Sequence, residues 1–293
     1  MRFATSYNTA YFGADPDQIA AYARHAEECG FEAFYLPEHV VLYPGAAVGS
    51  FELPPTLPYV DPLDCLSFVA AATDRILLGT GVLLLPYHHP VVLAKRLATV
   101  DVLSKGRMRL LTVGVGSLPG EARAVGVDFG TRGRRTDEAI DVLRLLWAGG
   151  EEGVSYDGEF FTLDRLVSFP KPHGSTSLPI HVGGSSRAAA RRAGQRGDGY
   201  FPGGALAPHE REIQMNLARQ SAAEAGRDPA ALEYTRWGSI DMTPEKVEAL
   251  AAQGVTRLVV NATATDPAQR LDELSAFAER FALRDGVGST GPR

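Results

Sequence analysis

Short apolar runs alternate with longer amphipathic segments along most of this 293-residue chain. The apolar runs have the length of buried strands, and the segments between them carry apolar residues at helical spacing. We expect strands over 2–8, 32–39, 75–85, 107–116, 178–184, 197–204, 232–241 and 256–264. Eight strand–helix pairs in a chain of this length are typical of an α/β fold, the (β/α)8 TIM barrel. A doubly wound open sheet is the alternative.

Local signals mark the first helix and one interruption of the repeating pattern. Asp15 can cap a helix that has Pro16 in its first turn, and Gly30 can end it. Before the fifth strand, the alternating stretch GVSYDGEFFTL, residues 153–163, carries the turn pair Asp157-Gly158. This stretch predicts a β-hairpin insertion before strand 5.

The composition does not change along the chain, so we expect a single domain over 1–283 and a flexible tail over 284–293. The net charge is −6 and the arginines are scattered, which argues against a nucleic-acid partner. The apolar runs reach only about half of the roughly 20 residues that a membrane span needs. The N-terminus lacks an apolar signal core. We therefore expect a cytoplasmic protein without a membrane partner.

In a TIM barrel the active site forms from the loops after the carboxyl ends of the strands. The candidate residues at these ends are Asn8, Glu38, His39, Gly81, Val82, Gly116, Ser117, Gly183, Gly184, Ser185, Ser186, Gly203 and Gly204. They include no lysine, so a Schiff-base mechanism lacks its amine. Neither Glu38-His39 nor His88-His89 has metal-ligand spacing, and we expect no catalytic metal.

The end of the fifth strand has the features of an anion-binding turn. Gly183 and Gly184 leave the backbone accessible, and Ser185 and Ser186 can add hydroxyl donors. The helix that begins there offers its N-terminal NH groups and the positive end of its dipole. Arg187, in its first turn, can reach a phosphate. We expect a phosphate site; a capped, tight strand–helix connection is the alternative.

Several segments resemble the luciferase-like monooxygenase family. They are YLPEH, LGTGVLLLPYHHP, LATVDVLSKGRMRLLTVGVG, RRTDEAIDVLRLLW, HVGGSS and GDGY, and the resemblance runs from Phe3 to Asn261. Their order and spacing are most similar to the branch that uses the deazaflavin coenzyme F420. The resemblance implies a (β/α)8 barrel with a flavin-type ring across its mouth and the cofactor phosphate on the turn at 183–186.

The resemblance also implies roles for residues near the ring. In the family the third strand ends in a non-prolyl cis peptide behind the ring, and the matching pair is Gly81-Val82. His39 matches a histidine near the reacting edge, where an imidazole can donate a proton or a hydrogen bond near neutral pH. Glu38 is expected to contact the polar edge of the ring. The alternatives are a plain strand glycine and structural roles for His39 and Glu38.

Departures from the family pattern limit the substrate. The F420-dependent sugar-phosphate dehydrogenases have an acidic residue at the position of Ser117 and lysines near Gly204 and Ala205, and this chain has neither. Glucose 6-phosphate is therefore not expected. The loop 40–60 predicts an apolar lid, or a loop that only packs down, from Leu42, Tyr43, Phe51, Leu53 and Tyr59.

These features predict a flavin-type oxidoreductase that uses F420 and transfers hydride between the deazaflavin C5 and a moderately hydrophobic organic small molecule. An FMN-dependent monooxygenase and a non-catalytic flavin-binding protein are the alternatives. His39 is the expected catalytic residue. The expected cofactor ligands are Glu38, His39, Gly81, Val82, Gly183, Gly184, Ser185, Ser186 and Arg187. A homodimer is expected from the resemblance.

Overall fold

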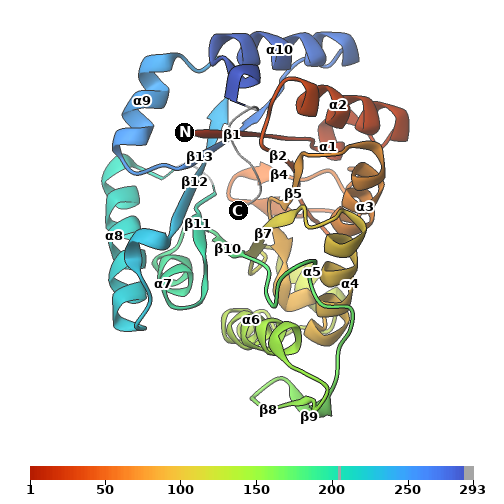
Figure 1. Cartoon of the computed structure of the whole chain (residues 1–293), viewed down its shortest axis with the longest axis vertical. Coiled ribbons are helices and arrows are strands. Elements are labelled where there is room, and N and C mark those ends of the chain that lie inside the picture. The colour runs from red at the N-terminus through yellow and green to blue at the C-terminus, as the bar shows by residue number, and fades with distance from the viewer. Residues whose placement is uncertain (204–205, 287–293) are drawn as a thin grey trace.

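The computed structural model describes residues 1–203 and 206–286, and eight parallel strands of these residues form a closed barrel (Figure 1). They are β1 (Arg2–Ser6), β2 (Ala33–Leu36), β5 (Leu77–Thr80), β7 (Met108–Gly114), β10 (Ile180–Gly183), β11 (Gly199–Phe201), β12 (Glu233–Ser239) and β13 (Arg257–Asn261). The pairing of β10 with β7 closes the barrel, because β13 already pairs with β1. The predicted (β/α)8 barrel is confirmed, and the open sheet is wrong.

Helices cover the outside of the barrel. The long ones are α2 (Pro16–Glu28), α3 (Pro62–Ala72), α4 (Pro90–Leu103), α6 (Arg132–Ala148), α7 (Arg187–Arg196), α8 (Pro208–Glu224), α9 (Pro244–Ala252) and α10 (Pro267–Arg280). Two short helices, α1 (Thr9–Phe12) and α5 (Pro119–Ala124), lie in the loops after β1 and β7. The Asp15 carboxylate accepts a hydrogen bond from the Gln18 NH at 2.9 Å, which confirms the predicted cap of α2.

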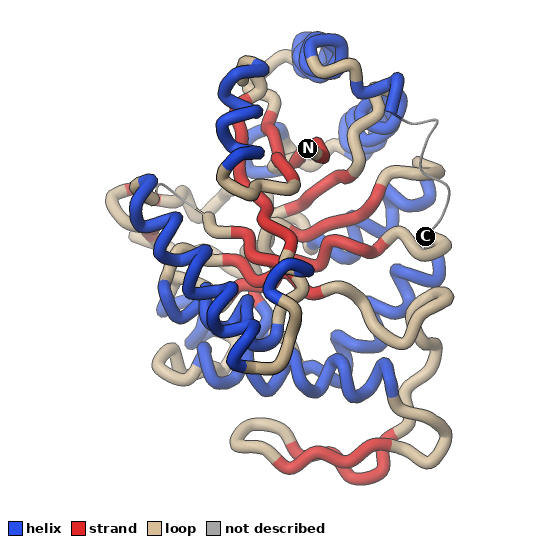
Figure 2. Tube along the Cα trace, turned by 60° about the vertical axis from the view of Figure 1, so that its left-hand side comes forward, coloured by secondary structure: helices blue, strands red, loops and turns tan. Residues whose placement is uncertain are grey.

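Two hairpins lie outside the barrel. β8 (Val154–Asp157) and β9 (Thr162–Leu166) form the predicted insertion, which projects away from the barrel strands in Figure 2. Asp157 pairs with Thr162, so the connection spans residues 158–161 and is longer than the expected turn at Asp157-Gly158. The Glu138 carboxylate of α6 accepts hydrogen bonds from two NH groups of this connection, which holds the longer turn. β3 (Ala47–Val48) and β4 (Phe51–Glu52) form a smaller hairpin within the loop 40–60.

Aromatic and aliphatic side chains fill the inside of the barrel. The rings of Tyr35 and Phe201 meet edge to face with centroids 6.0 Å apart, and the Trp237 ring lies 4.9 Å from Phe201. Leu110 and Val259 are buried in the same cluster. Because the interior is packed, a substrate or cofactor has to bind at the mouth of the barrel.

The described part of the chain ends in a short 3-10 helix, η3 (Leu283–Gly286). The predicted flexible tail, 284–293, therefore begins within this helix, and residues 287–293 lie outside the described residues. Across the described ranges no helix is both long and apolar enough to cross a membrane.

Candidate functional site

The segment after β2 places His39 at the carboxyl end of the barrel, against a buried carboxylate. The His39 Nδ1 lies 3.3 Å from Oε2 of Glu121, a fully buried residue of α5. The other oxygen, Oε1, accepts hydrogen bonds from the backbone NH groups of Val40 at 2.6 Å and Val41 at 3.4 Å. Glu121 therefore fixes both the imidazole and the backbone that follows it. The Nε2 of His39 makes no hydrogen bond to any described residue and is the nitrogen left for chemistry.

The loop 40–60 packs over this imidazole. The Tyr59 ring meets the His39 ring edge-on, with centroids 4.8 Å apart. Tyr43 accepts a hydrogen bond from a backbone NH of α5 at 3.2 Å, and Leu53 is buried in a small apolar cluster. Phe51, by contrast, is 56% exposed. Tyr43 and Leu53 thus pack the loop down, while the lid function of the loop stays a prediction.

Both carboxylate oxygens of Glu38 are engaged within the protein. Oε2 accepts a hydrogen bond from the Leu84 NH at 2.5 Å, and Oε1 lies 2.9 Å from Nε2 of His88. The Glu38 side chain is only 3% exposed. Glu38 therefore ties the end of β2 to the short strand β6 (Leu83–Leu84), which favours its structural alternative. Its contact with the edge of a ring stays a prediction.

The third barrel strand ends in the cis peptide that the family resemblance implied, at Gly81-Val82. The Gly81 NH donates to the carbonyl of the last residue of β2 at 2.8 Å, and the Val82 carbonyl accepts from the Glu38 NH at 3.2 Å. A Cβ at Gly81 would lie 3.5 Å from the rings of both Trp237 and Tyr35. The pair therefore lies directly against the aromatic side chains that fill the barrel.

Val82 links this pair to the turn after β10. A Cβ on Gly183 would lie 2.5 Å from one methyl group of Val82, and a Cβ on Gly114 would lie 2.8 Å from the other. The two glycines are therefore required to make room for Val82. Gly183 is buried, so its close packing against Val82 explains why this position is a glycine. The contact between Gly183 and a phosphate stays a prediction.

The turn itself is open to solvent. Residues 184–188 are exposed, and Gly184 has a φ of 112°, which residues other than glycine rarely adopt. The Ser186 hydroxyl caps α7 by accepting a hydrogen bond from an NH of its first turn at 3.1 Å. As an acceptor there, it keeps its own proton for an anion. The Ser185 hydroxyl donates to the Gly203 carbonyl.

Two polar side chains form hydrogen bonds to the backbone carbonyls of the turn. The Tyr200 hydroxyl lies 3.0 Å from the Gly184 carbonyl, and the Gln214 side-chain NH₂ donates to the Ser185 carbonyl at 3.0 Å. Arg187 pairs with Glu210 of α8 at 3.1 Å, and the hydrogen bonds from Arg187 and Gln214 lower the pKa of Glu210 to about 2. Arg187 is thus held toward α8, and its predicted contact with a phosphate would require it to leave Glu210.

Sequence reasoning missed Glu121. It lies in the stretch SLPGEARAVG, residues 117–126, which follows the fourth predicted strand. The local signal was weak: an acidic residue in the first turn of a short helix after the fourth barrel strand. Of the other candidate positions, Gly204 and Ala205 lie outside the described residues. Within the described residues no group of three or more His, Cys, Asp and Glu side chains could hold a metal ion.

Comparisons with known proteins bear on the fold and on the family of this chain. An F420-dependent glucose-6-phosphate dehydrogenase of Microbacterium testaceum is 32% identical over 205 residues, which cover 69% of this chain and 56% of that protein. The solved structure of the monooxygenase RslO1 from Streptomyces bottropensis matches with a TM-score of 0.78 at 20% identity, covering 97% of this chain and 100% of the other. An F420-dependent secondary alcohol dehydrogenase, solved with an F420–acetone adduct, also matches with a TM-score of 0.78, at 19% identity and coverages of 97% and 99%.

The two solved structures are too distant in sequence to support more than the fold. A family model carries the assignment further, because it matches residues 2–286. That range contains all eight barrel strands of the described residues and the residues of the candidate site, from Glu38 to Arg187. The chain belongs to the luciferase-like monooxygenase family.

Proposed function

We propose that this chain is an oxidoreductase that binds a flavin-type cofactor, F420, and transfers hydride between the deazaflavin C5 and a moderately hydrophobic organic substrate. The observation that carries the proposal is the His39 imidazole, held by the buried Glu121 on the rim that also carries Gly81-Val82 and the open turn after β10. The F420-dependent relative, which is 32% identical over 205 residues, supports the choice of cofactor.

The residues of the rim fit such a cofactor. The turn after β10 exposes backbone NH groups at the N-terminus of α7, and a phosphate is favoured there by hydrogen bonding and by the helix dipole. Ser186 would add its hydroxyl proton. Gly81 carries no side chain, so it would leave space for the ring of such a cofactor at the cis peptide.

When bound, the deazaflavin supplies the hydride chemistry. The protein supplies a proton site at Nε2 of His39. With Nδ1–H donating to Glu121, the neutral ring presents Nε2 as an acceptor. Nε2 then takes the proton from an alcohol substrate during oxidation and returns a proton to the oxygen during reduction. Tyr59 and the packed loop 40–60 limit the access of water to this nitrogen.

The substrate is proposed to differ from that of the dehydrogenase relative. Ser117 stands where the sugar-phosphate enzymes carry an acidic residue, and the loop near His39 presents aromatic and aliphatic side chains. These features support a moderately hydrophobic alcohol or carbonyl compound.

Separate addition of F420 and FMN to the purified protein tests this proposal. We expect F420 to bind, with a change in its absorption spectrum, and to be reduced by members of an alcohol panel without oxygen. Turnover with FMNH₂ and oxygen but not with F420 would favour the FMN-dependent monooxygenase. Binding without any turnover would favour the non-catalytic alternative.

A further inference from the structure

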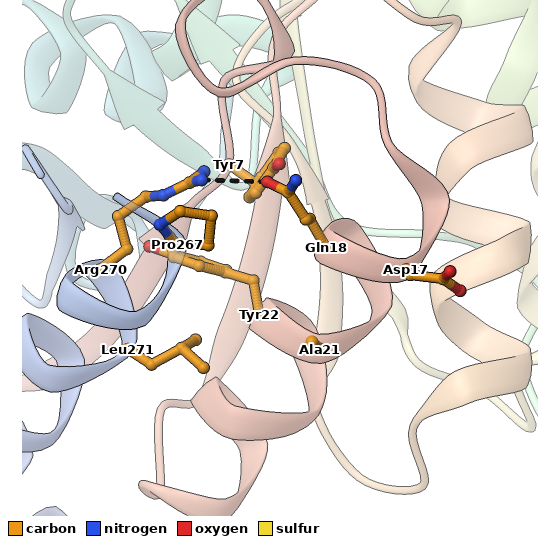
Figure 3. A pocket seen from close by; sticks show the side chains of 8 residues that line it. All are labelled: Tyr7, Asp17, Gln18, Ala21, Tyr22, Pro267, Arg270 and Leu271. Atoms are coloured by element: carbon orange, nitrogen blue, oxygen red, sulfur yellow. Dashed lines mark hydrogen bonds between the residues drawn. The ribbon is translucent and has the colours of Figure 1, made fainter. Parts of the chain in front are cut away.

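A cavity of about 240 Å³ lies between α2 and α10, outside the barrel (Figure 3). The two helices pack side by side at the top of Figure 1, and Tyr7, which follows β1, closes the space between them. The cavity contains none of the residues assigned to the flavin site.

Arg270 is the unusual residue of this cavity. Its side chain is only 3% exposed, and its Nη2 donates a hydrogen bond to the Gln18 side-chain oxygen at 3.1 Å. Its Nε has no partner, and within the described ranges it forms no ion pair. The Phe12 ring lies 4.5 Å from its Cζ, so one face of the guanidinium is covered by an aromatic ring. A buried cation with so few partners is costly, and a bound anion would offset that cost.

The acidic residue of the cavity does not neutralise Arg270. Asp17 is exposed, and its carboxylate points away from the guanidinium in Figure 3. Asp266, the N-cap of α10, accepts a hydrogen bond from the Gln269 NH at 3.0 Å. The guanidinium of Arg270 is therefore not paired with Asp17, the one acidic residue among those that line the cavity.

The rest of the wall is apolar. Ala21, Pro267 and Leu271 present hydrocarbon surface, and Tyr22 presents its ring. The Tyr22 hydroxyl is already bonded to Thr5 Oγ1 at 2.8 Å, so it offers little to a ligand. A cavity with one cationic group and apolar walls suits an amphiphilic anion.

We infer that this cavity binds a small organic monocarboxylate, with its carboxylate on Arg270 and its apolar body against Tyr22, Pro267 and Leu271. A free phosphate fits less well, because α10 begins with Pro267, which has no NH, and the cap is filled by Asp266. A dianion would therefore meet a single guanidinium. The site is independent of the proposed function, and its test needs no flavin.

Thermal unfolding with benzoate as the probe tests the site, because a ligand that binds the folded state raises Tm. We expect a rise of roughly 2–5 °C at benzoate concentrations near ten times its Kd. Benzyl alcohol, which has the same ring without the charge, is expected to give a much smaller rise. An equal rise with benzyl alcohol, or no rise with benzoate, overturns the inference.

Three variants locate the effect. Arg270→Met removes the charge at similar length, and Ala21→Phe fills the cavity while leaving Arg270 in place; both should abolish the benzoate shift. Arg24→Met, on an exposed position of α2, makes the same change in net charge and should retain the shift. If Arg270→Met does not fold, Ala21→Phe decides. A full benzoate shift in Ala21→Phe overturns the site.

Discussion

The two ends of the barrel both bury charged groups, but they arrange them differently. At the amino end, Arg257 is only 1% exposed and donates to Glu32 at 2.7 Å and to Glu233 at 2.5 Å. Arg2 also binds Glu233, at 2.7 Å, and His181 lies 3.4 Å from the same carboxylate. Opposite charges therefore compensate one another at this end.

At the carboxyl end, buried carboxylates meet histidines instead of arginines. Glu121 holds His39 and Glu38 holds His88, and no arginine of the described residues pairs with either carboxylate. A neutral imidazole that donates from one nitrogen can still accept a proton at the other. Arginine–carboxylate pairs compensate charge at the amino end, whereas the carboxyl end, where the active sites of this fold form, pairs its buried carboxylates with imidazoles.

The largest expected effect is on the carboxyl end. His39→Ala should reduce turnover about 10²–10⁴-fold, because it removes the proton site. The thermal stability should also fall, because the fully buried Glu121 carboxylate loses its side-chain partner, so turnover is compared on folded protein. Steady-state kinetics with F420 and a responsive alcohol measure this effect.

His89→Ala is the matched control for that variant. His89 lies on the same rim, is exposed, and its side chain makes no hydrogen bond to the described residues. Its removal should leave turnover close to that of the unmodified protein. An unchanged rate in His39→Ala would remove the chemical role of the carboxyl end.

The next effect is on the amino end. Arg257→Met should lower the free energy of unfolding by about 3 kcal/mol, because Glu32 and Glu233 lose their buried partner. The protein that remains folded should bind the cofactor normally. Urea unfolding measures the loss, with Arg134→Met as the control because its ion pair with Glu159 is exposed. Equal losses in both variants would contradict the stabilising role of the amino end.

Glu121→Gln should give an intermediate effect. It keeps the shape of the side chain but removes the charge that orients His39, so kcat should fall about 10–100-fold. The KM for F420 should stay unchanged, because Glu121 acts through His39 and is not expected to touch the cofactor. If the KM for F420 rises while kcat is preserved, Glu121 contributes to cofactor binding, and the proposal that it positions His39 is wrong.

The barrel could be predicted from the sequence because its strands are buried apolar runs and its helices carry local signals, such as the Asp15 cap of α2. The rim followed from the fold, and the Gly81-Val82 cis peptide followed from the family resemblance. Which side chains of the site are hydrogen-bonded to each other could not be predicted. His39 and Glu121 are 82 positions apart, and nothing in their local sequences links them.

Glycine in the sequence was equally ambiguous. Gly183 and Gly184 are adjacent, yet the first makes room for Val82 and only the second adopts a positive φ on an open turn. The sequence alone does not distinguish the two glycines, because a glycine can be required either by close packing or by a positive φ. Only the neighbours in space separate the two uses.

The smallest expected effect is a pH dependence at the amino end. Burial lowers the pKa of His181 from its ordinary value of 6.5 to about 4. Between these two values the unfolded chain binds more protons than the folded one, so the free energy of unfolding falls as the pH falls. The stabilisation is complete above pH 6.5, and we expect a loss of about 1 kcal/mol between pH 6.5 and 5.5.

Urea unfolding at a series of pH values measures this slope. His181→Gln should flatten it between pH 6.5 and 5.5, because the titrating group is gone. His209→Gln, at an exposed position of α8, should leave it unchanged. The pKa of Glu233 is lowered overall, because the lowering by Arg257 and its other neighbours outweighs the raising by burial. The contribution of Glu233 to the stability is therefore lost only at more acidic pH. If the slope in this range survives the loss of His181, the amino end is not the source of the acid sensitivity, and the contrast between the two ends would then rest on Arg257 alone.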